Sequence, residues 1–139
     1  RQVTGMIREK SATYQASTAL PPPIAAAGTA SLALIRENPG MRRELLDKAW
    51  MIREAVAAMN FRTTRFGTPI IPLLFNSAEK ANGLSQFLEE NGVIVPSVNY
   101  PARQQLYLVR IAVSITHTED QIGQLLGLLK QWKDKNESN

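Results

Sequence analysis

The 139-residue sequence contains no cysteine and only one histidine. Without cysteine the chain can form no disulfide framework and no thiolate site, and a single histidine excludes a metal cluster built on histidines. No apolar run approaches the roughly 18 residues that a membrane-spanning helix needs. These absences favour a cytoplasmic protein that holds no metal and does not enter a membrane.

A basic segment is also missing, although the formal net charge is +4. The 16 lysines and arginines are scattered among 12 acidic residues, and the adjacent pair Arg42 and Arg43 is followed directly by Glu44. A solvated helix face explains such a pair better than a nucleic-acid surface. We therefore expect no nucleic-acid partner.

What the chain does contain is enough apolar material for one domain. Hydrophobic residues make up 44% and charged residues 20% of the sequence, which is ordinary for a globular protein. The sequence starts at Arg1 rather than at a methionine, which suggests a piece of a longer chain.

Periodicity and turn residues predict an α+β fold with a small, mostly antiparallel sheet covered by helices. We expect helices over 24–38, 41–59, 76–91 and 118–133, and strands over 61–65, 69–75, 93–98 and 106–113. Residues 1–10 have helical spacing without a start signal, 11–23 should form a loop because of three consecutive prolines, and the chain should fray from residue 134. Asn76 is the expected N-cap of the third helix, and Gly92 its stop signal.

The strand over 106–113 carries a single cation, Arg110, among apolar residues. Alternation places Arg110 on the same face as Leu108 and Ala112, opposite to Val109 and Ile111. A charge on a mostly buried strand costs several kcal/mol unless an anion meets it. Three explanations are open: an internal Asp or Glu, solvent exposure at a sheet edge, or a ligand carboxylate, which the planar fork of arginine suits well.

A helix start follows this strand closely. Thr118 and Gln121 have the spacing of a capping box, in which each side chain bonds the backbone N–H of the other residue. His117 lies just before the box, and we expect it to orient this turn rather than to transfer protons.

The segment V-R-I-A-V-S-I-T-H-T-E-D-Q-I, residues 109–122, resembles the C-terminal signature of the α-oxoamine synthases. These pyridoxal-phosphate enzymes include aminooxononanoate synthase, 2-amino-3-ketobutyrate ligase and aminolevulinate synthase. The segments S-T-A-L-P-P at 17–22, E-N-P-G-M-R-R-E-L at 37–45 and the stretch 67–75 are similar to further elements of this family, in the same order. The resemblance therefore covers nearly the whole chain.

The resemblance implies the C-terminal domain of a transferase of PLP fold type I, the aspartate aminotransferase type. Residues 1–16 would then be a lead-in from an absent large domain, 17–133 the C-terminal domain and 134–139 a polar tail. Within a homodimer, Arg110 would bind the α-carboxylate of an amino-acid substrate, and Thr18, with Ser17, would reach the phosphate of pyridoxal 5'-phosphate in the partner subunit. The implied reaction condenses the amino acid with an acyl thioester.

The departures from the family pattern matter equally. The lysine that holds the cofactor in this family lies in a glycine-rich stretch, and none of the six lysines here has such a context. We therefore expect no catalytic residue in this chain and no activity of the chain alone. Two alternatives remain, an aminotransferase domain and a non-catalytic interaction module, and Ser17 and Thr18 could equally form a plain loop with local backbone bonds.

Overall fold

The computed structural model describes residues 2–18, 20–99 and 106–137, with the side chains of Asn99 and Glu137 left aside. The chain divides into two compact units, Arg1–Asn38 (unit 1) and Pro39–Asn139 (unit 2). Each unit is described by itself. The predicted limits at residues 17 and 134 concern the domains of a longer parent and stay predictions.

Unit 1 consists of the helices α1 (Gln2–Lys10), α2 (Ala12–Ala16) and α3 (Pro22–Glu37). The predicted loop over 11–23 is wrong in part, because α2 lies within it. The Ser11 Oγ accepts a hydrogen bond of 3.2 Å from the Tyr14 N–H and so begins this short helix. No residue of these helices that the structure describes is buried.

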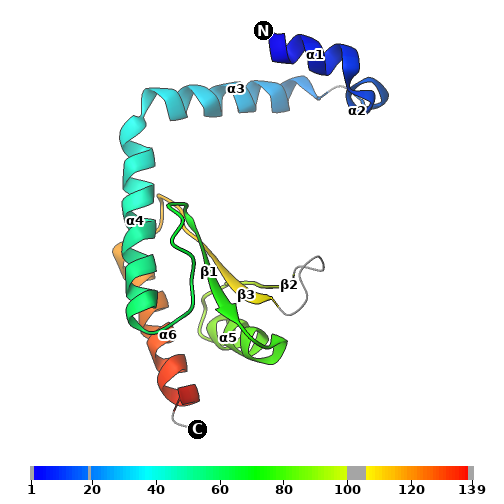
Figure 1. The fold of residues 1–139 in the computed structure, drawn as a ribbon. Coiled ribbons are helices and arrows are strands. Elements are labelled where there is room, and N and C mark those ends of the chain that lie inside the picture. Colours follow the sequence, from blue (N-terminus) through cyan, green and yellow to red (C-terminus); the bar gives the residue numbers. More distant parts are fainter. Residues whose placement is uncertain (1, 19, 100–105, 138–139) are drawn as a thin grey trace. The chain divides into compact units, whose positions relative to one another are not determined.

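Unit 2 runs α4 (Pro39–Ala58), β1 (Ile70–Phe75), α5 (Ala78–Glu90), β2 (Ser97–Asn99), β3 (Tyr107–Ala112) and α6 (Glu119–Glu137). The three strands form an antiparallel sheet in the order β1-β3-β2, which places β3 at the centre (Figure 1). The predicted small antiparallel sheet is confirmed.

The three helices of unit 2 pack against one face of this sheet. Sheet residues on that face and helix residues facing them share a single core, whose largest fully buried side chains are Ile52, Val56, Ile71, Leu73, Leu84, Leu88, Val109 and Leu129. The predicted apolar face of the last helix is confirmed, because Ile122, Leu125, Leu129 and Trp132 are all buried.

No helix of unit 2 lies over the opposite face of the sheet, as far as the structure describes this unit. We call this face the open face. The strand register places on it Ile70, Pro72, Leu74, Val98, Leu108, Arg110 and Ala112. Of these, Leu108 is buried, whereas Ile70, Arg110 and Ala112 are exposed.

Several predicted boundaries are corrected by contacts between distant residues. The strand expected over 61–65 is a single bridge between Arg62 and Leu74. Asn76 does not cap α5, because its Oδ1 accepts a hydrogen bond of 2.7 Å from Arg62 Nη1; the cap is Ser77, whose Oγ accepts from the Lys80 N–H.

Two further boundaries differ from the predictions. The strand expected over 93–98 is the shorter β2, which begins at Ser97 and ends at Asn99, and α6 continues to Glu137 instead of fraying from residue 134. The last turns of α6 are anchored because Trp132 packs against Phe61 and Phe75. Gly92 ends α5 with a φ of +80°, as predicted. The loop expected between β2 and β3 lies, from residue 100 to 105, outside the described residues.

Candidate functional site

Arg110 lies on the central strand β3 and points its side chain from the open face. It is exposed, so the expected mostly buried environment is wrong. The central position of β3 also rules out a sheet edge, and Arg110 forms no ion pair with any residue that the structure describes. The charge is accommodated because the guanidinium is exposed, and a ligand carboxylate as its partner stays a prediction.

The turn after β3 is held by several hydrogen bonds. The Ser114 N–H donates to His117 Nδ1 over 3.1 Å, and the Lys48 ammonium donates to the Ile115 carbonyl over 2.7 Å. An accepting Nδ1 leaves the proton of a neutral imidazole on Nε2. His117 therefore orients the turn, in agreement with its predicted role.

The capping box at the start of α6 is confirmed. The Thr118 N–H donates to Gln121 Oε1 over 3.0 Å, and the Gln121 N–H donates to Thr118 Oγ1 over 3.2 Å. These bonds satisfy two backbone donors that a helix start leaves free. The direction in which α6 leaves the sheet is thus determined locally.

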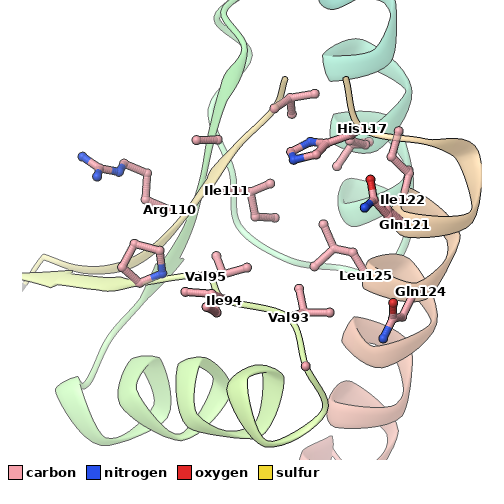
Figure 2. A pocket seen from close by; sticks show the side chains of 15 residues that line it. Val93, Ile94, Val95, Arg110, Ile111, His117, Gln121, Ile122, Gln124 and Leu125 are labelled. Carbon is pink, nitrogen blue, oxygen red and sulfur yellow. The ribbon is translucent and has the colours of Figure 1, made fainter. Parts of the chain in front are cut away.

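A cavity of about 490 Å³ lies between residues 92–96, the second half of β3 and the first turns of α6. Its walls are mainly apolar, and their polar side chains are those of Arg110, His117, Gln121 and Gln124. Figure 2 shows the Arg110 side chain pointing away from those of His117 and Leu125. Arg110 and His117 thus line the same cavity, but the guanidinium does not point toward the ring.

Ser17 and Thr18 belong to unit 1, where they connect α2 to α3. Both are exposed, and the Ser17 hydroxyl donates to the Tyr14 carbonyl over 3.3 Å. Their predicted contact to a cofactor phosphate stays a prediction. Such hydroxyls fit a phosphate, which accepts hydrogen bonds.

Three of the six lysines form side-chain contacts that the structure describes. The Lys48 ammonium is engaged by Glu44 at 3.1 Å and by two carbonyls, and the ammonium groups of Lys133 and Lys135 lie over aromatic rings. The exposed Arg110, Ser17 and Thr18 fit a carboxylate and a phosphate, and the expected lack of an anchor lysine stays a prediction. No group of three potential metal ligands and no helix able to span a membrane occurs among the described residues.

Sequence reasoning missed Arg53, which is only 3% exposed. Its Nε donates to the Thr64 carbonyl over 2.9 Å, and its Nη2 donates to the carbonyls of Thr68 and Ile70 over 3.0 and 3.1 Å. A signal was available: Arg53 lies four residues after Ala49 and three before Val56, within the apolar stripe of α4.

A family model described as aminotransferase class I and II matches residues 2–129. This chain belongs to the aminotransferase class I and II family. Within this family, the 8-amino-7-oxononanoate synthase of Dechloromonas aromatica is 36% identical over 124 residues, which are 88% of this chain and 32% of the relative. The same enzyme of Methylococcus capsulatus is 34% identical over 122 residues, 87% of this chain and 32% of the relative.

Solved structures agree with the family. An 8-amino-7-oxononanoate synthase from Francisella tularensis has a TM-score of 0.79 at 25% identity, covering 100% of this chain and 41% of that chain. A serine palmitoyltransferase from S. paucimobilis, which carries PLP bound to myriocin, has a TM-score of 0.89 at 23% identity over 100% of this chain and 36% of that one. The predicted PLP fold type I and the resemblance to the α-oxoamine synthases are confirmed. The chain spans about a third of the length of the curated relatives it matches.

Proposed function

We propose that this chain is the C-terminal, substrate-closing domain of a PLP-dependent acyltransferase, which condenses an amino acid with an acyl thioester to an α-amino ketone. The observation that carries the proposal is Arg110, an exposed arginine at the centre of an otherwise apolar open face. The similarity to 8-amino-7-oxononanoate synthases supports the reaction class.

In this proposal Arg110 binds the α-carboxylate of the amino acid with two parallel hydrogen bonds. Fixing the carboxylate also fixes the direction of the remaining bonds at the α-carbon, and thereby which of them breaks. Pyridoxal phosphate, when bound, supplies an electron sink for the electrons that this bond releases. The hydroxyls of Ser17 and Thr18 hold the phosphate in the partner subunit of a homodimer.

The open face supports a closing role. An apolar face with exposed Ile70 and Ala112 around one arginine is suited to meet another protein surface that excludes water from the site. We infer that the remaining two thirds of the fold cover this face and supply the cofactor lysine. The chain alone is then inactive, and we expect the complete protein to be cytoplasmic.

The Arg110→Ala variant of the complete enzyme tests the carboxylate assignment. Loss of a charge-assisted contact should lower kcat/KM for the amino acid by roughly 2 to 5 kcal/mol, because one partner of a desolvated charge pair is removed. Arg110→Lys should recover only part of this loss, since an ammonium keeps the charge without the fork. Saturation kinetics and the melting temperature are measured side by side on both variants.

Cofactor absorbance serves as the control, because Arg110 is not assigned to the phosphate and PLP binding should survive. A lowered melting temperature with an unchanged KM for the amino acid would instead mark Arg110 as a structural residue and contradict the assignment.

The absence of an anchor lysine makes a second prediction, on the 139-residue chain itself. Mixing it with pyridoxal phosphate and reducing with borohydride should leave only weak adducts spread over several lysines. Mass spectrometry of the digested chain checks this. One stoichiometric adduct at a single lysine would contradict the proposal that the chain needs the rest of the fold.

The matched family model favours amino-group transfer as a second candidate, since its description names aminotransferases. The two reactions differ in the second substrate, which is an acyl thioester in one and a keto acid in the other. Product formation from each, measured with the same complete enzyme, separates them.

A further inference from the structure

Arg110 lies between two prolines that come from different segments. The β1–β3 register pairs it with Pro72, and the β2–β3 register, which pairs Ser97 with Val109, places Pro96 opposite Arg110 on the other side. The Arg110 N–H donates to the Pro96 carbonyl over 3.0 Å, which shows this second adjacency directly. The prolines therefore flank Arg110 across the central strand.

Pro72 occupies a site in β1 where its missing N–H costs no sheet bond. The Val113 N–H, directly after β3, donates to the Pro69 carbonyl, directly before β1. The Leu74 N–H of β1 points away from β3 and donates to the Arg62 carbonyl. The direction of the backbone N–H alternates along a strand, so the backbone nitrogen of Pro72, two residues before Leu74, also points away from β3. Pro72 and Arg110 are therefore a pair without mutual hydrogen bonds. Side chains approach most closely in such pairs, with Cα atoms about 4.5 Å apart.

Pro96 and Arg110 form the other type of pair, in which the two residues normally exchange two backbone hydrogen bonds. The Pro96 carbonyl accepts from the Arg110 N–H, but proline has no N–H to complete the usual reciprocal pair. The ladder stops here, since β2 begins at Ser97, and residues 92–96 diverge from β3 to form one wall of the 490 Å³ cavity. The β2 side of Arg110 is thus bounded by a second rigid ring.

We propose that Pro72 and Pro96 are positioning residues that hold the Arg110 side chain extended from the open face for the substrate carboxylate. This inference rests on the proposed function of Arg110. Proline has no rotamers to lose, so each ring presents a fixed wall to the flexible arginine stem. Neither ring offers an acceptor, so no side chain directly across the sheet competes for the guanidinium fork.

The test uses the complete enzyme with Pro72→Ala, Pro96→Ala and the double variant. Each single change should raise KM for the amino acid about three- to tenfold. The reason is that the Arg110 side chain would then lose its conformational freedom only when the substrate binds. The values of kcat, KM for the acyl thioester and PLP absorbance should stay unchanged. Pro39→Ala, at the exposed start of α4, is the matched control and should change none of these quantities.

The same changes in the Arg110→Ala background separate positioning from general stability. If the prolines act through Arg110, they should have no further effect on the amino-acid KM once Arg110 is absent. A rise in KM of the same size in both backgrounds, or an unchanged KM in both single variants, would overturn the inference.

A charge at position 72 gives an independent readout. In Pro72→Glu a carboxylate faces Arg110 and should compete with the substrate, raising the amino-acid KM roughly tenfold above that of Pro72→Gln, which has the same shape without the charge. Equal KM values for Glu and Gln would contradict the placement of Pro72 beside the fork. If Arg110→Ala itself leaves KM unchanged, the proposed function fails; if only the proline variants do, the positioning inference fails alone.

Discussion

The guanidinium of Arg53 is stabilised in the interior of unit 2 without a carboxylate. It donates to the carbonyls of Thr64, Thr68 and Ile70, which bracket the loop before β1. Pro69 in this loop accepts from Val113 and extends the ladder between β1 and β3. Arg53 thus connects α4 to the end of the sheet at which β1 begins.

Replacing Arg53 should be among the most destabilising changes in the chain. Arg53→Ala removes the donor from the carbonyls of Thr64 and Thr68, leaves that of Ile70 to the Thr68 hydroxyl and creates a cavity, which should lower the free energy of unfolding by about 2 to 4 kcal/mol. Arg53→Lys should regain a minor part, because one ammonium cannot reproduce the fork. Urea unfolding of the 139-residue chain measures both.

Arg65→Ala is the control for Arg53, since Arg65 is an exposed arginine of the same loop. It should change the free energy of unfolding by less than about 0.5 kcal/mol. If Arg53→Ala lowers the free energy of unfolding no more than Arg65→Ala does, the stabilising role of the Arg53 hydrogen bonds is contradicted.

At the scale of elements, the two glycines of the α5 region should respond to alanine with opposite signs. Gly92 has a φ of +80°, where an alanine is strained although space is open around it. Gly83 lies inside α5 with no atom within 4 Å of an added Cβ. Gly92→Ala should therefore cost about 1 kcal/mol in the free energy of unfolding, and Gly83→Ala should add about 0.5 to 1 kcal/mol.

The same urea titration measures both glycine variants, and each serves as the control for the other. Stabilisation by Gly92→Ala would show that α5 does not end in this left-handed conformation.

Elements determined by neighbouring residues could be predicted from the sequence. The capping box of Thr118 and Gln121 and the apolar face of α6 depend on residues three or four positions apart, and both are confirmed. Alternation likewise separated Arg110 from Val109 and Ile111 correctly. Such spacing is visible in a one-dimensional pattern.

The rest depends on contacts between distant residues, which no local pattern contains. Asn76 has the chemistry of a cap, yet its side chain bonds Arg62, 14 residues away. The strand expected over 93–98 begins only at Ser97, because Pro96 cannot return the hydrogen bond that Arg110 donates. The apolar run of β3 suggested a mostly buried strand, whereas the described helices of unit 2 pack against only one face of it.

At the scale of the whole molecule, the open face and the length of the relatives lead to the same conclusion. The chain spans about a third of the relatives, and no described helix of unit 2 covers the apolar face of its sheet around Arg110. A face of this composition is suited to close over a substrate that a second domain holds. We therefore predict that the carboxylate of this substrate meets Arg110.

The most direct test removes Arg110 and the substrate carboxylate separately and together, in the complete enzyme. Dissociation constants are measured for the amino acid and for the matching amine that lacks the carboxylate, with Arg110 and with Arg110→Ala. We predict that Arg110→Ala weakens binding of the amino acid by about 2 kcal/mol or more and leaves binding of the amine unchanged. Equal weakening of both ligands would contradict the account.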